Sequence, residues 1–305
     1  MTAMVFSAIL VVLTFVAVML VSGNNLSACV GPVIGSRIIS KRFGIFLGAL
    51  GFSAGLLVQG AGMTRTVGVL LPDATVELRA AALLVSILIF IIAEVIRVPM
   101  SVSMSLVGLL AGLSIASNAS GSGAFATTVV IMWFAAPLIA ITLAFSLIRV
   151  LNRSWPSNFW QRIQSYKLLL IALSFSSAYV LGANTLGLVV ATGGFDLATV
   201  GAAVIGVFVG AFYLSGGAIR RVSQEFYLMR YTNATATLVT STVLVELATL
   251  FNIPLSNTQT TASAVFGAGM SYRTKFVSLK PFLTIVAGWI VAPLISFAIG
   301  LLINI

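Results

Sequence analysis

Apolar residues fall into long blocks that short polar connections separate. The blocks cover roughly 3–21, 24–36, 43–62, 80–98, 104–116, 124–150, 167–192, 199–215, 232–252, 260–270 and 282–303. An α-helix needs about 20 apolar residues to cross the hydrocarbon core of a bilayer. The pattern therefore predicts an all-α polytopic membrane protein. It leaves open whether the first 40 residues form one broken span or two.

The composition supports this class. Of the 305 residues, 60% are hydrophobic and 7% are charged, whereas charged residues make up about 25% of a soluble domain. The single cysteine, Cys29, excludes an intrachain disulfide. The absence of histidine removes the commonest general base and metal ligand, so we expect no metal site, no resident cofactor and no enzyme.

The basic residues are unevenly distributed along the chain. Fourteen of the 16 lie in five places, which include the polar segment 152–165, whereas Arg65 and Arg79 are left for the opposite side. Cytoplasmic loops carry the excess of Lys and Arg. The net charge of +10 is therefore a topology marker rather than a sign of nucleic-acid binding. The uneven distribution of the basic residues predicts a cytoplasmic linker at 152–165 and both termini outside. We expect this protein in the plasma membrane.

Three motifs recur in the same order, 155 to 159 residues apart. The first motif is Ser-Gly-Asn-Asn at 22–25, repeated as Leu-Gly-Ala-Asn at 181–184. The second is Pro-Met-Ser-Val-Ser-Met at 99–104, repeated as Pro-Leu-Ser-Asn-Thr-Gln at 254–259. The third is Trp-Phe-Ala-Ala-Pro-Leu-Ile at 133–139, repeated as Trp-Ile-Val-Ala-Pro-Leu-Ile at 289–295. With five crossings in each half, the second half would run inverted. We expect repeats at 1–151 and 166–305, an arrangement typical of secondary transporters.

The first pair of motifs interrupts apolar sequence with Gly23 and Asn25, and again with Gly182 and Asn184. Such positions allow broken helices whose free backbone groups face a polar cavity. A close helix–helix contact is the alternative for one motif alone. Because the motif is repeated, we favour a substrate site.

The second pair of motifs begins with Pro99 and Pro254, which suit the first turn of a helix. Hydroxyl and amide side chains follow at once, and an α-helix that starts this way offers free N–H groups, hydroxyls and its positive dipole end to an anion. Ordinary N-capping is the alternative. The apolar stretches that follow, 104–116 and 260–270, are short for spans, which favours re-entrant hairpins or half-helices. The polar residues concerned are Ser101, Ser103, Ser256, Asn257 and Thr258.

Two carboxylates lie within apolar segments. Glu94 and Glu246 precede the two prolines by five and eight residues. An intramembrane carboxylate is a functional candidate. Glu94 could instead pair with Arg97 near a helix end. Our hypothesis is that Glu246, together with Glu94, carries a coupled proton.

At these motifs the chain resembles the inorganic phosphate transporter (PiT) family, whose members move phosphate or sulfate. That family has Gly-Ala-Asn-Asp and Pro-Val-Ser-Thr-Thr-His motifs in each half. The resemblance implies an inverted repeat and a homodimer. Where the family has aspartates implicated in sodium binding, this chain has Leu26 and Thr185, and where it has histidine, this chain has Met104 and Gln259.

We therefore expect a secondary active transporter of a tetrahedral inorganic oxyanion, with phosphate ahead of sulfate and with sodium or a proton as the coupled ion. An anion channel and a membrane-embedded lipid phosphatase are the alternatives from other classes. The candidate substrate-binding residues are Asn25, Ser101, Ser103, Asn184, Thr185, Ser256, Asn257 and Thr258. The candidate ion-coupling residues are Glu94, Glu246, Asn25, Asn184 and Gln259.

Overall fold

The computed structural model describes residues 2–36, 38–72, 74–95, 101–117, 122–154, 158–216, 231–271 and 279–303. Every regular element within these ranges is helical, which confirms the predicted class. Six helices there are long and apolar enough to cross a membrane. They cover Val5–Gly35, Lys41–Val58, Gly123–Asn152, Ile163–Gly193, Leu197–Leu214 and Tyr231–Leu250.

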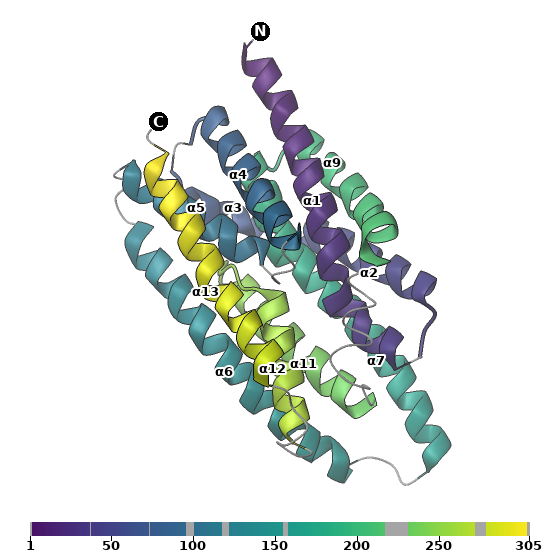
Figure 1. Ribbon diagram of the computed structural model, residues 1–305. Helices are drawn as coiled ribbons and strands as arrows, with labels where there is room; N and C mark the ends of the chain where they lie inside the picture. Colours follow the sequence, from purple (N-terminus) through teal and green to yellow (C-terminus); the bar gives the residue numbers. More distant parts are fainter. Residues whose placement is uncertain are drawn as a thin grey trace.

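The helices form one elongated bundle (Figure 1). The first half holds α1 (Thr2–Gly35), α2 (Lys41–Val58), η1 (Gly60–Gly62), α3 (Met63–Leu70), α4 (Val76–Val95), α5 (Val102–Ala116) and α6 (Ser122–Ser154). The second half holds α7 (Phe159–Leu181), η2 (Gly182–Leu186), α8 (Gly187–Gly193), α9 (Leu197–Val209), η3 (Gly210–Leu214), α11 (Tyr231–Leu250), α12 (Asn257–Met270) and α13 (Leu279–Leu302).

The first Gly-Asn motif does not break its helix. The prediction of a broken helix is wrong here, because α1 runs without interruption through Gly23 and Asn25. Gly23 serves close packing instead: a Cβ atom there would lie 2.5 Å from Cβ of Leu214 in η3. The apolar blocks 3–21 and 24–36 are therefore one helix.

The second copy of the motif does change the helix. Gly182–Leu186 forms the π-helical turn η2, which joins α7 to α8 in one helical run. Such turns insert an extra residue into a helix and are frequent at functional sites. The duplicated sequence thus produces an α-helix in one half and a π-turn in the other.

Two equivalent contacts each join a helix of one half to a helix of the other half. The α9–η3 segment lies on α1, where a Cβ atom at Gly210 would collide with the carbonyl oxygen of Met19. The matching contact joins α2 to α7, where a Cβ atom at Gly55 would collide with the carbonyl oxygen of Tyr179. Gly55 and Gly210 are 155 residues apart and Met19 and Tyr179 are 160 apart, close to the spacing of the repeated motifs.

The short helices are exchanged between halves in the same way. Gly112 of α5 lies against the carbonyl oxygen of Phe297 in α13, and Gly267 of α12 lies against that of Ile141 in α6. Each half therefore supplies a short helix that packs along the final helix of the other half. This is the arrangement that a duplicated chain would give. The inversion of the halves across a membrane stays a prediction.

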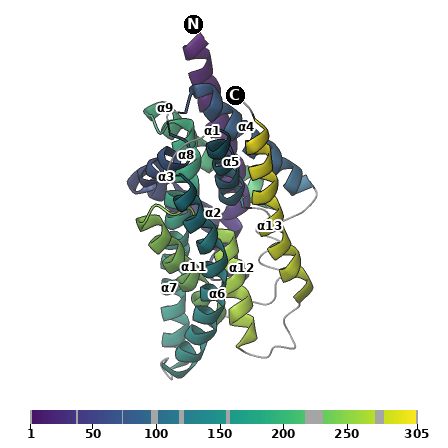
Figure 2. The ribbon, with the colours of Figure 1, turned by 90° about the vertical axis from the view of Figure 1, so that its left-hand side faces the viewer.

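The beginning of α1 and the end of α13 lie at one end of the bundle, and the end of α6 and the start of α7 lie at the other (Figures 1 and 2). Near that second end, Val33 of α1, Tyr166 of α7 and Ala234 of α11 share one apolar cluster. The end of α1, the first half of α7 and the start of α11 are therefore close together. Most of the polar segment 152–165 is helical, because α6 extends to Ser154 and α7 begins at Phe159.

Candidate functional site

The connection between α11 and α12 is non-helical and becomes buried from Pro254 onward, and Asn184 in η2 holds it in place. The amide nitrogen of Asn184 donates to the hydroxyl of Thr249 and to the carbonyl oxygen of Ile253, both at 3.0 Å. Its amide oxygen accepts from the backbone N–H of Leu255, also at 3.0 Å. Buried polar groups must be paired in this way. The predicted substrate-binding side chain of Asn184 is thus occupied by the protein itself.

Trp133 of α6 fixes the same connection from the other side. Its indole N–H donates to the carbonyl oxygen of Pro254 at 3.1 Å. Pro137 has no N–H, so the carbonyl oxygen of Trp133 lacks its helical donor. The side-chain amide of Gln259 donates to that oxygen at 2.8 Å. The amide nitrogen of the predicted coupling residue Gln259 therefore binds α6.

A third element, α3, completes the anchoring of the connection. The hydroxyl of Thr66 donates to the carbonyl oxygen of Asn252 at 2.5 Å. Asn252 adopts a left-handed backbone conformation with φ of 56°, which asparagine tolerates better than most residues. Irregular backbone is stable at membrane depth only when protein satisfies it. Here three successive carbonyl oxygens, those of residues 252 to 254, each have a donor from a different element.

The start of α12 carries the predicted hydroxyls. Ser256 is the N-cap, and its hydroxyl oxygen accepts from the backbone N–H of Gln259 at 3.2 Å. The hydroxyls of Ser256 and Thr258 lie 3.0 Å apart. The first backbone N–H groups of an α-helix have no partner within the helix. This buried helix start therefore presents N–H and O–H donors together with the positive end of the helix dipole.

One face of α1 connects the two predicted motifs. Val21, Asn25 and Cys29 are spaced by four residues, so they lie on the same face. Cys29 lies 3.6 Å from the amide nitrogen of Asn257 in α12. Val21 lines a small pocket together with Val102 of α5. Asn25 thus lies between the starts of the two short helices, and its buried amide oxygen has no hydrogen-bond partner.

The start of α5 resembles that of α12. Ser101 is its N-cap, and the hydroxyls of Ser101 and Ser103 lie 2.9 Å apart. Both serines are buried. Pro99 lies outside the described residues. The spacing along α1 puts the neighbourhoods of the two serine motifs about 12 Å apart, at 1.5 Å per residue.

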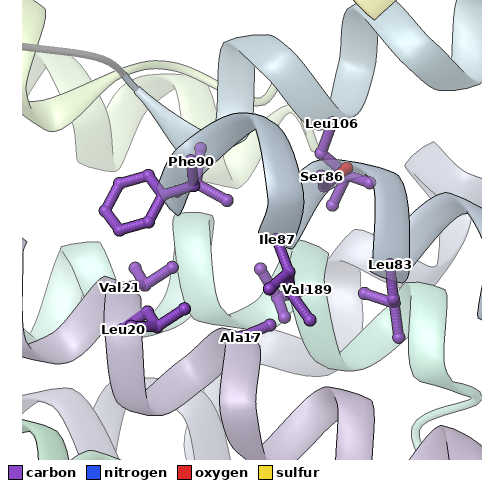
Figure 3. Close-up of a pocket in the computed structure, with 10 residues that line it drawn as sticks. Ala17, Leu20, Val21, Leu83, Ser86, Ile87, Phe90, Leu106 and Val189 are labelled. Carbon is purple, nitrogen blue, oxygen red and sulfur yellow. The ribbon is translucent and has the colours of Figure 1, made fainter. Parts of the chain in front are cut away.

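The pocket between α1, α4, α5 and α8 is not the anion site. Its volume is about 10 Å³, which is close to the minimum for one water molecule. Its lining is apolar apart from Ser86 (Figure 3). The residues around it are Ala17, Leu20, Val21, Leu83, Ser86, Ile87, Phe90, Val102, Leu106 and Val189.

The remaining candidates lie in different places. Thr185 is buried in η2. The backbone of Glu94 belongs to α4, but its side chain lies outside what the structure describes. Glu246 is half-buried on α11, where one carboxylate oxygen accepts from the side-chain amide of Gln59 at 3.1 Å. The other oxygen of Glu246 is buried without a partner.

Sequence reasoning missed four residues at these sites, namely Trp133, Thr249, Gln59 and Thr66. The repeated Trp-x-x-x-Pro pattern was a usable signal for Trp133, because proline leaves the preceding tryptophan carbonyl free. The other three are single polar residues among many, and only the folded chain brings them to their partners.

The fold and this site define a polytopic helical membrane protein with two short helices whose polar starts are buried beside a common helix. The chain belongs to the phosphate transporter family, whose model matches residues 21–186 and 181–305. This confirms the resemblance to the phosphate transporters.

Two relatives match over nearly the whole chain. A protein of Methanocaldococcus jannaschii that is provisionally named a phosphate permease is 25% identical over 96% of this chain and 95% of its own length. The sulfate permease CysP of Bacillus subtilis is 26% identical over 92% of this chain and 82% of its own length. The fold matches a solved sodium-dependent phosphate transporter with a TM-score of 0.85, at 14% identity and 98% coverage of both chains.

Proposed function

We propose that this protein is a secondary active transporter that carries phosphate across the plasma membrane by ion-coupled alternating access. The observation that supports this proposal most directly is the buried start of α12, where Ser256 and Thr258 present hydroxyls. On α1, Asn25 has an unpartnered amide oxygen and lies one turn before Cys29, which contacts Asn257 of α12. Membership of a transporter family supports transport, rather than catalysis, as the function of this site.

The site binds an oxyanion through donors that the fold has already oriented. Each charge-assisted hydrogen bond contributes about 1.5–3 kcal/mol. Because the α11–α12 connection is anchored by Asn184, Trp133 and Thr66, the donors need little reordering when the anion arrives. The anion exchanges its water shell for these groups.

The exchanged helices support alternating access. Each short helix packs along a helix of the other half, so a rocking motion between the halves would change access to the site from either side. The glycine contacts at Gly112 and Gly267 provide close interfaces about which such motion could occur. Transporters with related halves move in this manner around a central site.

Sulfate is the second candidate substrate, because CysP is a relative of similar identity. Both anions are tetrahedral. Hydrogen phosphate can donate a hydrogen bond, whereas sulfate only accepts. The acceptor at Asn25 favours phosphate in our proposal.

Uptake by the purified protein in liposomes tests the proposal. Radiolabelled phosphate and sulfate are offered separately, each with and without a sodium gradient and a proton gradient. We expect counterflow of phosphate and gradient-driven accumulation. Flux without counterflow would indicate a channel, and release of inorganic phosphate from lipid phosphates would indicate a phosphatase.

Site variants connect the activity to the geometry. Ser256→Ala and Thr258→Val should weaken phosphate binding by about 1.5–3 kcal/mol for each charge-assisted bond lost. Ser117→Ala is the matched control, because Ser117 is exposed at the end of α5 and bonds only to carbonyl oxygens of its own helix. Equal effects of the Ser256 and Ser117 changes would refute the assignment of the site.

A further inference from the structure

Glu246 lies on α11, separate from the residues at the start of α12. Val243, Leu247 and Leu250 on the same helix are exposed and apolar, so this side of α11 faces the lipid. Glu246 lies half-buried beside that face. An uncompensated carboxylate at such a position is costly. The cost falls when the carboxylate takes up a proton.

Among the residues that the structure describes, the immediate partners of Glu246 carry no fixed positive charge. Gln59 at the end of α2 donates to one carboxylate oxygen at 3.1 Å. Tyr179 of α7 interacts with the carboxylate electrostatically. No salt bridge involving Glu246 occurs among the described residues, where its second oxygen is buried and unpartnered. The carboxylate therefore has a free position for a proton.

The other titratable groups described on the helices around α11 lie elsewhere. Lys167 precedes Tyr179 by 12 residues on α7, about 18 Å along the helix. The guanidinium of Arg149 on α6 lies over the ring of Phe145 on the same helix, 4.3 Å from the ring centroid. Cys29 of α1 contacts α12 at the anion site.

Gln59 suits a proton site, because the amide of a glutamine can donate to a carboxylate and accept from a carboxylic acid.

A continuous set of contacts joins Glu246 to the anion site. Thr249 lies one turn further along α11, and its hydroxyl accepts from Asn184. Asn184 in turn holds Ile253 and Leu255, directly before the N-cap Ser256. A change at the end of α11 is thus transmitted to the start of α12 through packed groups rather than across open space.

We infer that Glu246, with Gln59 and Tyr179, forms a proton-binding site that is separate from the anion site and coupled to it through the last turn of α11. The inference rests on the proposed transport function. Protonation forms an O–H bond at the free carboxylate oxygen and neutralises Glu246, and release on the other side of the membrane breaks that bond. Each transported anion then moves together with a proton that the protein itself carries.

The experiment uses the full chain in sodium-free liposomes with inorganic phosphate. An inward proton gradient should drive accumulation of labelled phosphate by the wild type. Glu246→Gln should lose this accumulation while phosphate counterflow stays close to the wild-type rate. Glu77→Gln, which changes an exposed carboxylate at the start of α4, is the matched control and should behave as the wild type.

Each of the other possible results contradicts either the inference or the proposed transport function. Proton-driven accumulation that persists in Glu246→Gln overturns the inference, since the proton would then travel on the phosphate itself. Accumulation by the wild type with sodium but not with protons also overturns it. Loss of counterflow in a folded Glu246→Gln protein assigns the residue a structural role. A wild type that exchanges neither phosphate nor sulfate would instead defeat the proposed transport function.

A second variant covers the case in which Glu246→Gln does not fold. Gln59→Leu keeps the carboxylate and removes the donor that stabilises its charged form. The pH profile of proton-driven uptake should therefore differ from that of the wild type. An unchanged pH profile in folded Gln59→Leu protein contradicts the role of the pair.

Discussion

The carbonyl oxygen of Trp133 accepts a hydrogen bond from the side chain of Gln259 at 2.8 Å, although both residues lie in helices. This is possible because Pro137 provides no N–H one turn later in α6. The equivalent position in the other half, 155 residues earlier, is Met104, which cannot donate. The two halves therefore differ at the point where a short helix meets its long partner.

Gln259→Met should destabilise the protein. The change keeps the volume of the side chain but leaves the buried carbonyl oxygen of Trp133 unpaired, which costs about 1–3 kcal/mol. The unpartnered amide oxygen of Gln259 is removed at the same time, so we expect the lower end of that range. Thermal unfolding in detergent measures the effect. Gln259→His keeps a ring N–H donor and should recover stability, and equal midpoints for the two variants would contradict this account.

Asn184→Asp should abolish most transport. The aspartate can still accept from Leu255 N–H but loses the donors to Thr249 and Ile253, so a buried carbonyl oxygen faces a carboxylate. Each buried group left unpaired costs about 1–3 kcal/mol. The rate of counterflow and the midpoint temperature of thermal unfolding should both fall. Asn152→Asp on the exposed end of α6 is the control, and full activity of Asn184→Asp would show that the anchoring is dispensable.

The close contact between η3 and α1 predicts that alanine substitutions at two glycines of the α9–η3 segment will differ in their effect on stability. Gly210→Ala places a methyl group against the carbonyl oxygen of Met19, and overpacking of this kind costs about 1–3 kcal/mol. Gly201 has no atom within 4 Å of its Cβ position, so Gly201→Ala should not destabilise. The unfolding midpoints of the two variants give the test. A similar midpoint for both would rule out tight packing between α1 and η3.

The sequence predicted the class of protein and the positions of the short helices well. Runs of apolar residues determine which segments enter a membrane, and α5 and α12 begin within three residues of the expected blocks. The Gly-Asn motif was harder to interpret. Gly23 and Gly182 have the same local sequence signal, but one lies in an unbroken helix and the other begins a π-turn.

The site was predictable in its residue types but not in its pairings. Proline followed by hydroxyls indicated where α5 and α12 begin, with Ser101 and Ser256 as N-caps. Pro254 was expected in the first turn of its helix, but it lies two residues before the N-cap. The roles of Asn184 and Gln259 as anchors depend on carbonyl oxygens that only the folded connection exposes. Local sequence contains no information on partners 65 to 126 residues away. The substrate and coupling roles of the candidates stay predictions.

The basic residues predict the side on which each loop lies. In a Cys29→Ser background, a single cysteine at Asn158 should react with a membrane-impermeant thiol reagent only after the cells are opened, because this loop is expected in the cytoplasm. Leu197 at the start of α9 is 91% exposed and belongs to the predicted outer side. A cysteine there should react in intact cells. Labelling in the opposite sense would reverse the predicted topology.

Asn25 predicts the preference between the two anions. Its buried amide oxygen is an acceptor without a partner, so it can receive the hydrogen of hydrogen phosphate. Sulfate has no hydrogen to offer, and its oxygens would be repelled by the same group. Asn25→Leu should therefore weaken phosphate exchange much more than sulfate exchange. Competition between the two anions in counterflow measures the ratio, with Asn24→Leu, one residue earlier on α1, as the control. If the ratio of phosphate to sulfate exchange in Asn25→Leu equals that of the wild type, another group must accept the hydrogen bond from hydrogen phosphate.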